Sequence, residues 1–300
     1  MHRAIAAWLD ERSWHAGVAS AVCGVMAPQM PLPFLILAAA IAALVTLKKD
    51  GRLGLMLAAT ASIAAAAVIL PMPQPEKLTL AGCVAVIFGA ALLASIWRGT
   101  RSPNLVFQVA VLGMAIALVL VYVVLPDPDA IWVERLTELM KSMTEAGLAA
   151  KRDDLDALVQ VWARTMWGAL AAMMLSAVLA SVFLGRWWST LLQSPGEFGA
   201  EYRQLRLGRV LGIGVTILFI LALSMESPLL DSLAWVALAG LSFQGLAAAH
   251  RGKANGRLNR GWLAAIYALL LMPLSTSVTV FVLAIWGFVD NWLRPRGPVT

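Results

Sequence analysis

The sequence predicts an all-α fold, a polytopic membrane bundle of about eight to ten transmembrane helices. Hydrophobic residues make up 60% of the 300 residues and charged residues only 13%. Apolar stretches recur from Trp14 to Trp292 and are separated by short, mostly basic loops. Strands of a membrane barrel would alternate apolar and polar side chains, and runs such as Ala64–Ala67 do not.

The N-terminal membrane half, residues 1–125, is expected to hold about five spans. Trp14–Ala27 and Leu32–Leu47 flank a turn that begins at Pro28, and prolines at that density break a helix. We expect a hairpin of two short spans here; the alternative is one kinked span, which would reverse the N-terminus. The first stretch is interpreted as a retained span rather than a signal peptide. The later spans of this half are Leu53–Leu70, Leu78–Trp97 and Leu105–Leu125.

Residues 126–160 form the longest polar region and are expected to be an external amphipathic helical segment. Acidic residues outnumber basic ones, and apolar residues fall near one helical face: Ile131, Leu136, Leu139, Met140 and Met143. The segment is either a cap on the bundle or the membrane interface, or a lid or docking site for an envelope partner. We favour the cap, because an apolar stripe first needs a surface to bury against.

The C-terminal membrane half, residues 161–300, contains a cytoplasmic elbow at residues 185–209. Pro273 divides its last apolar segment, which is either one kinked span or a tight hairpin. The hairpin keeps Arg294 and Arg296 inside, as the positive-inside rule prefers, so we lean to it. The spans of this half are Val161–Leu184, Val210–Met225, Leu229–Ala249 and Trp262–Trp292.

The net charge of +6 is interpreted through membrane topology and the anionic surface of the lipid bilayer. Basic residues cluster in alternate loops, as at Lys48–Arg52 and Arg251–Arg260, and mark those loops as cytoplasmic. Nucleic acid is therefore not an expected partner.

No catalytic or metal-binding motif is visible, so the chain is expected not to be an enzyme and to carry no cofactor. Gly240–Gln244 resembles a nucleophile elbow but lacks its final glycine. Cys23 and Cys83 lie in apolar segments and are interpreted as buried, inert thiols, while the histidines are scattered.

Polar side chains at membrane depth are the candidate ligand-binding residues. Arg164, Asp231 and Asp290 lie near span ends, where they can snorkel to the interface. Gln244 is expected to lie deep, and Gln108 either faces a ligand or bonds another helix. The predicted ligand-binding set is Gln108, Gln244 and Tyr267.

Small residues recur at helical spacing in three places, and helix packing is the first interpretation of each. An alternative for the first set, Gly208 and Gly212, is a groove for a partner helix. The sets are Gly208 and Gly212; Ala16, Ser20 and Gly24; and Ala58, Ser62 and Ala66.

The elbow combines adjacent tryptophans, a Pro195–Gly196 turn and several arginines. It is interpreted as an interfacial anchor for the next span, with a cytoplasmic docking surface as the functional alternative. The candidate docking residues are Arg186, Trp187, Trp188, Phe198, Glu201, Tyr202, Arg203 and Arg206.

Three blocks of this sequence resemble a bacterial family of membrane proteins catalogued as domain of unknown function 2232. They are the elbow motifs Arg186-Trp187-Trp188, Pro195-Gly196 and Glu201-Tyr202-Arg203-Gln204-Leu205-Arg206, then Gln244-Gly245-Leu246-Ala247, and finally Gly287-Phe288-Val289-Asp290-Asn291-Trp292. The resemblance covers mainly Val161 to Arg294 and implies a bacterial inner-membrane protein without naming a reaction.

Some members of that family look distantly similar to substrate-binding subunits of energy-coupling-factor transporters and to a shape-determining membrane protein. In such a subunit, small residues of an early span couple to a partner, a part that Ala16, Ser20 and Gly24 could play. The resemblance thus implies a transporter-like subunit that binds a small solute or recruits a cytoplasmic ATPase. The alternative is a non-catalytic scaffold for cell-envelope machinery. The present chain has more spans than the roughly six of such subunits, so this analogy rests on fold alone.

Overall fold

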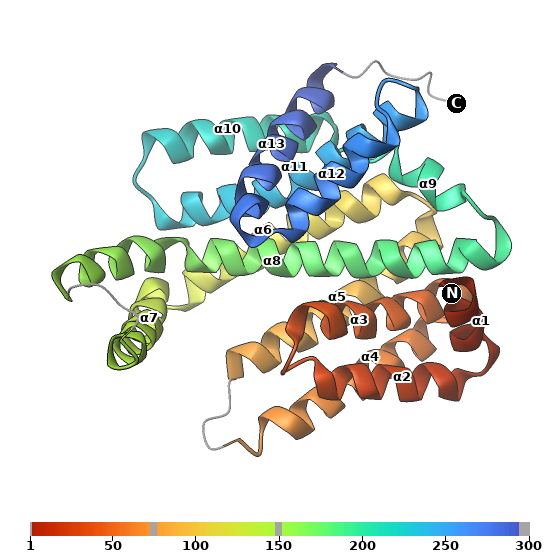
Figure 1. The fold of residues 1–300 in the computed structure, drawn as a ribbon, viewed down its shortest axis with the longest axis horizontal. Helices are drawn as coiled ribbons and strands as arrows, with labels where there is room; N and C mark the ends of the chain where they lie inside the picture. Colours follow the sequence, from red (N-terminus) through yellow and green to blue (C-terminus); the bar gives the residue numbers. More distant parts are fainter. Residues whose placement is uncertain (1, 73–76, 148–151, 294–300) are drawn as a thin grey trace. The chain divides into compact units, whose positions relative to one another are not determined.

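The computed structural model describes residues 2–72, 77–147 and 152–293, and these residues are all-α, as predicted. Figure 1 shows the course of the chain. The helices are α1 (His2–Glu11), α2 (Ser13–Met26), α3 (Pro31–Lys48), α4 (Gly51–Ile69), α5 (Lys77–Thr100), α6 (Pro103–Val124), α7 (Pro128–Glu145), α8 (Arg152–Gln193), α9 (Glu197–Tyr202), α10 (Gly208–Ser224), α11 (Pro228–Ala254), α12 (Arg260–Leu271) and α13 (Pro273–Leu293).

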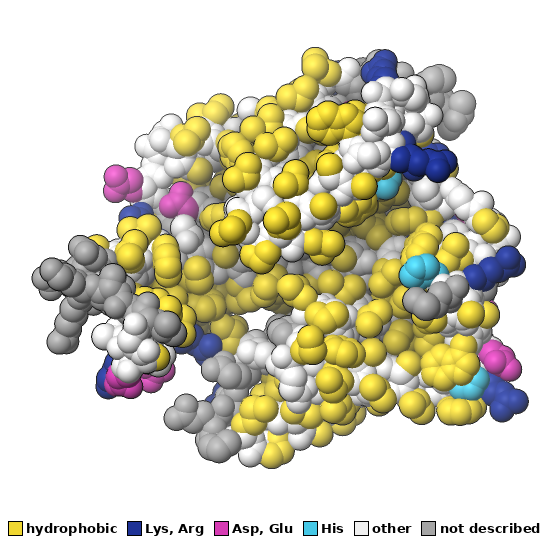
Figure 2. Space-filling view, viewed as in Figure 1, with side chains coloured by type: hydrophobic (Ala, Val, Ile, Leu, Met, Phe, Trp, Pro, Cys, Tyr) yellow, Lys and Arg dark blue, Asp and Glu magenta, His cyan; other side chains and the backbone are white. Residues whose placement is uncertain are grey.

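The chain is a multi-pass membrane protein. Within the described ranges, six helices are long and apolar enough to cross a bilayer, namely α4, α5, α6, α8, α11 and α13. Three shorter apolar helices, α3, α10 and α12, accompany them. Apolar side chains cover much of the visible surface, as expected of helices that face lipid (Figure 2).

The helices are organised in two compact units that do not follow chain order. One unit comprises Met1–Ala110, Met174–Arg206 and Ala247–Leu263. The other comprises Val111–Met173, Leu207–Leu246 and Ala264–Thr300. The predicted division into residues 1–125, 126–160 and 161–300 follows chain order, whereas the boundaries of the compact units cut through α6, α8, α11 and α12.

In the first unit, α2 packs closely on α4 through small residues. The Ser20 hydroxyl donates to the Leu57 carbonyl at 3.1 Å. A Cβ on Gly24 would lie 2.3 Å from the Ala61 carbonyl oxygen, so only glycine permits this approach. The stripe Ala16, Ser20 and Gly24 therefore faces the protein's own helix, as the packing interpretation predicted.

The break predicted at Pro28 is present, because α2 ends at Met26 and α3 begins at Pro31. The two helices pack against each other. Consecutive helices joined by so short a link can do this only if the chain reverses, as in the predicted hairpin and unlike one kinked helix. That both helices cross the membrane stays a prediction, since α3 is one of the shorter apolar helices.

Helix α8 is longer than the sequence indicated. The predicted span ended at Leu184 and the predicted loop began at Gly185, but α8 runs unbroken over 42 residues to Gln193. A Cβ on Gly185 would lie 2.9 Å from the Ala40 carbonyl oxygen, so this glycine allows α8 to approach α3. The turn predicted at Pro195–Gly196 is confirmed, with Gly196 in a left-handed conformation at φ 95°.

In the second unit, α7 packs its apolar stripe on the first part of α8. Leu136 is 8% exposed and forms a small core with Val159 and Ala163. The Trp167 indole donates to the Pro128 carbonyl at 2.8 Å and fixes the start of α7. Leu139, by contrast, is 50% exposed. This arrangement supports the cap interpretation of the external segment, whose residues 148–151 lie outside the described ranges.

The last apolar segment is broken at Met272, directly before Pro273. Figure 1 shows α12 and α13 meeting there in a V, which agrees with the hairpin. With 12 residues, α12 is about 18 Å long, shorter than the ~30 Å hydrocarbon core of a bilayer.

Candidate functional site

Two amide side chains hold the start of α10 in the second unit. Gln244 Oε1 accepts the Leu207 N–H at 2.8 Å, and Asn291 Oδ1 accepts the Gly208 N–H at 3.1 Å. Asn291 Nδ2 donates back to the Gly208 carbonyl at 3.0 Å. The first N–H groups of a helix have no partner within the helix, so these bonds satisfy donors that would be expensive to bury. We call Gln244 and Asn291, with Leu207 and Gly208, the polar clamp.

Two glycines bring the clamp residues together. A Cβ on Gly245 would lie 1.9 Å from the Leu283 carbonyl oxygen, and one on Gly287 would lie 2.1 Å from the Leu241 carbonyl oxygen. Helices α11 and α13 therefore cross with their backbones in contact. The crossing places Gln244 Nε2 3.4 Å from Asn291 Oδ1, and these side chains are 0% and 4% exposed.

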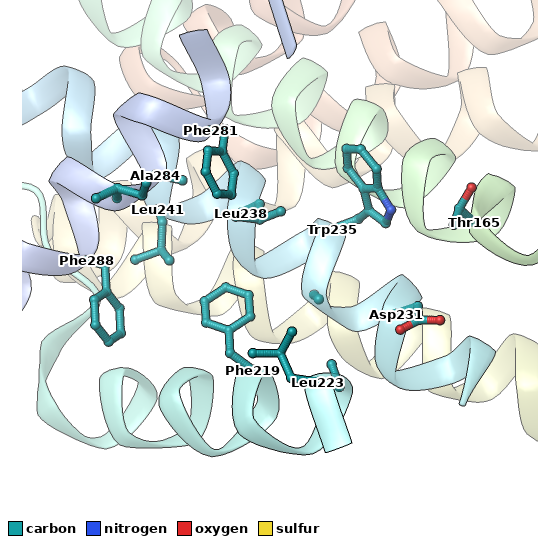
Figure 3. Close-up of a pocket in the computed structure, with 13 residues that line it drawn as sticks. Thr165, Phe219, Leu223, Asp231, Trp235, Leu238, Leu241, Phe281, Ala284 and Phe288 are labelled. Carbon is teal, nitrogen blue, oxygen red and sulfur yellow. The ribbon is translucent and has the colours of Figure 1, made fainter. Parts of the chain in front are cut away.

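An apolar cavity of about 630 Å³ lies in the second unit between α8, α10, α11 and α13 (Figure 3). Its volume falls in the range of small-molecule sites. Leu241, Ala284 and Phe288 line it, each one helical turn before a residue of the crossing or the clamp. The full lining is Thr165, Phe219, Ala222, Leu223, Asp231, Ala234, Trp235, Leu238, Leu241, Phe281, Ala284, Ile285 and Phe288.

A second, polar cavity of about 490 Å³ adjoins the apolar one. The two share Thr165, Ala222, Leu223 and Asp231 in their linings, so they lie side by side with a common wall. Arg164 and Glu226 add charge to the polar cavity. The pair forms a two-part site, largely apolar within and charged at one end.

The walls near Asp231 are fixed by contacts between α6, α7, α8 and α11. The Tyr122 hydroxyl lies 3.1 Å from Ser232 Oγ and donates to Asp129 Oδ1 at 3.3 Å. A Cβ on Gly168 would lie 2.6 Å from Ser232 Cα, so α8 and α11 are in close contact there. Burial raises the pKa of Asp129 above its ordinary value, opposed by the Tyr122 hydrogen bond and the positive charge of Arg164.

The three predicted ligand-binding residues are not part of the linings of the two cavities. Gln244 is deep, as expected, but its side chain bonds protein groups in the clamp. Gln108 belongs to the first unit and Tyr267 to the second, and neither lines the two cavities described above. Sequence reasoning passed over Asp231 as a snorkelling residue, and the apolar lining residues resemble those that face lipid.

The predicted docking residues largely form the interior of the elbow. Glu201 accepts from Arg186 at both oxygens, with Nε–Oε2 at 2.9 Å and Nη2–Oε1 at 2.6 Å. The same Nη2 donates to Glu197 at 2.9 Å. The Arg186 guanidinium also lies 5.8 Å from the centre of the Trp97 ring.

The aromatic and remaining basic residues of the elbow also contact their own unit. Trp188 and Tyr202 are buried. The rings of Phe198 and Tyr202 lie 5.8 Å apart, and the Trp187 ring lies 5.3 Å from the His2 ring. The backbone carbonyl of Arg203 accepts from the Arg251 side chain, and the backbone N–H of Arg206 donates to the Asn104 side chain. These contacts support the anchor interpretation over an open docking surface.

In the described part of the chain, no group of His, Cys, Asp and Glu side chains is arranged to hold a metal ion. Cys23 and Cys83 are buried and not joined to each other.

No family model, curated protein or solved structure gives a match to this chain. The candidate site therefore has to be interpreted from its own geometry.

Proposed function

We propose that this protein is a transporter-like subunit of the bacterial inner membrane that binds a small, mostly apolar solute. One observation carries the proposal, the apolar cavity between α8, α10, α11 and α13. Such a cavity fits a ligand that partitions into the bilayer, because an apolar ligand needs few polar partners. Asp231 and Thr165 lie at one end of the cavity, so that end is polar and the rest is apolar.

The clamp and the glycine crossing give this cavity a preformed wall. Helices α10, α11 and α13 are joined by buried hydrogen bonds one turn from its lining. A preformed wall lowers the conformational entropy that a ligand must offset on binding. The clamp residues thus support the site from behind without contacting the solute.

The resemblance to domain of unknown function 2232 and the basic loops support an inner-membrane location with those loops inside. In that orientation the end of the cavity near Asp231 lies toward the outer face. A cytoplasmic ATPase remains the proposed partner. The stripe Ala16, Ser20 and Gly24 is packed on α4, so such a partner would use another surface.

The test is purification of the tagged native protein in a mild detergent, with mass spectrometry of the small molecules and proteins that stay bound. A Leu238→Trp variant fills the apolar cavity, and Ala264→Trp on the exposed side of α12 is the matched control. We expect a co-purifying apolar molecule that is lost only from Leu238→Trp. Equal retention by both variants would overturn the proposal.

A scaffold for envelope proteins is the second candidate, and the pairing of deep polar groups favours it. Gln244 and Asn291 bond each other and α10, and Tyr122 bonds Ser232, so these groups are already used within the protein. Cell-wall or division proteins in the same purification, with neither ATPase nor small molecule, would establish this candidate instead.

A further inference from the structure

We infer that the solute is a bilayer phospholipid with a primary ammonium in its head group, seated with its chain in the apolar cavity and its head in the polar one. The inference rests on the proposed function and names the class of molecule bound. It follows from three features, namely the composition of the two cavities, the lateral opening of the apolar one, and the charges of the polar one.

The two adjoining cavities differ in the way that the apolar and polar parts of an amphiphile differ. Phe219, Trp235, Phe281 and Phe288 supply aromatic walls to the apolar cavity. Arg164, Glu226 and Asp231 supply charges to the polar cavity. A uniformly apolar solute would leave the polar cavity unused, and a compact polar solute would leave the apolar one unused.

The apolar cavity opens toward the side of the helices rather than being enclosed. Leu223 is 90% exposed and Phe281 is 54% exposed, although both line it. They lie on α10, a short apolar helix, and on α13, which is long enough to span the membrane. Phe281 lies near the middle of α13, where lipid surrounds a membrane-spanning helix, so a lipid chain enters there from the bilayer without crossing water.

The charges of the polar cavity select the head group. Two carboxylates, Glu226 and Asp231, face one guanidinium, Arg164, so a purely anionic head meets an excess of negative charge. A zwitterionic head matches the set, because its phosphate pairs with the guanidinium and its ammonium N–H groups donate to the carboxylates. A quaternary ammonium has no N–H to donate.

The experiment is native mass spectrometry of the full chain released from vesicles of defined composition, mixing phosphatidylethanolamine, phosphatidylglycerol and phosphatidylcholine in equal parts. Glu226→Gln with Asp231→Asn removes the carboxylates without changing their shape, and Glu134→Gln on α7 is the charge control. Ala222→Phe narrows the junction of the two cavities. Thermal stability of each variant establishes that it is folded.

We expect one phosphatidylethanolamine to be retained, roughly tenfold more weakly after removal of the carboxylates, as for the loss of a partly solvated charged hydrogen bond. Ala222→Phe should abolish retention and Glu134→Gln should not change it. Retention of all three lipids alike, lost only in Ala222→Phe, would overturn the head-group assignment and leave the proposed function standing. Retention that no cavity variant changes would overturn both.

Discussion

Glycines set the closest helix contacts at the scale of single residues. Gly245 and Gly287 lie at the crossing of α11 and α13, where a Cβ would overlap a carbonyl oxygen of the facing helix. The sequence shows both glycines, yet spacing alone does not say which helix each one faces. Only the fold distinguishes them from Gly214, beside which the space is open.

Gly245→Ala should strongly destabilise the protein. The facing backbone oxygen cannot move aside as a flexible side chain would, so α11 and α13 must separate and the clamp must open. We expect a loss above the ~1–3 kcal/mol typical of overpacking. Gly214→Ala is the control and should be neutral or up to ~1 kcal/mol stabilising. Thermal unfolding in detergent compares them, and equal melting temperatures would contradict the crossing.

The polar clamp predicts coupling between residues far apart in the sequence. Gln244→Leu and Asn291→Leu each leave buried backbone groups at the start of α10 without a partner, at a cost of roughly 1–3 kcal/mol per group. Because the two side chains also bond each other, the double variant should lose less than the sum, with a coupling of about 0.5–3 kcal/mol. A double-mutant cycle measures this, and strict additivity would contradict a shared network.

Asp129 should make stability depend on pH in the sense opposite to a salt-bridged carboxylate. Its pKa is raised in the folded state, so the folded protein binds its proton more tightly than the unfolded chain. Stability is therefore lost as pH rises from the unfolded pKa of about 3.9 through the folded pKa.

Asp129→Asn keeps an oxygen for the Tyr122 hydroxyl and removes the titration. The variant should melt above the wild type at pH 7, and the difference should shrink as pH falls to about 4. Glu138→Gln, on the exposed side of α7, is the control for the loss of an acidic side chain. A difference that grows on acidification would contradict the raised pKa.

At the scale of elements, the sequence predicts a break between two helices better than it predicts the residue at which a helix ends. Pro28 and Pro273 mark real breaks, because proline has no backbone N–H and fits a helix only in its first turn. The predicted end of α8 at Leu184 was wrong, because Gly185-Arg186 has the composition of a loop. In the structure Arg186 is paired with Glu201 and Glu197, and that pairing lets the helix continue past a charge. A local sequence pattern does not show a charge partner that lies more than ten residues away in the chain.

The docking of α7 on α8 gives a matched test. Leu136→Ala removes a buried side chain and should cost about 2–5 kcal/mol, whereas Leu139→Ala removes an exposed one and should stay within about 0.5 kcal/mol. Trypsin reports on this element because Arg135 and Lys141 lie on α7. Cleavage there should speed up only in Leu136→Ala, and equal rates in the two variants would contradict the docking.

For the whole molecule, hydropathy correctly predicted an all-α, multi-pass chain, because the bilayer requires long apolar helices. It did not predict the cavity. Leu238 and Ile285 line it, yet in sequence they are indistinguishable from residues that face lipid. The ligand set was drawn from polar residues, and the deepest of them, Gln244, is used within the protein.

The V of α12 and α13 predicts the side on which the chain ends. Because the chain reverses at Met272, the end of α13 should lie on the same side of the membrane as the basic loop that joins α11 and α12. Reporters fused after Thr300 and inserted at Asn255 should both report the cytoplasm, and one inserted at Gly147 should report the outer side. Opposite sides for the first two would contradict the hairpin.

The polar clamp can form only late in the synthesis of the chain. Gly208 meets Asn291 only after the ribosome has added 83 more residues. At 5–20 residues per second this is a delay of roughly 4 to 17 seconds, during which α10 has been synthesised but its first turn lacks the hydrogen bonds to Asn291. A nascent chain arrested before Asn291 offers quality-control proteases a helix whose first turn lacks its last-made partner. The contact of α13 with the start of α10 is thus among the last contacts that the second unit can form during synthesis.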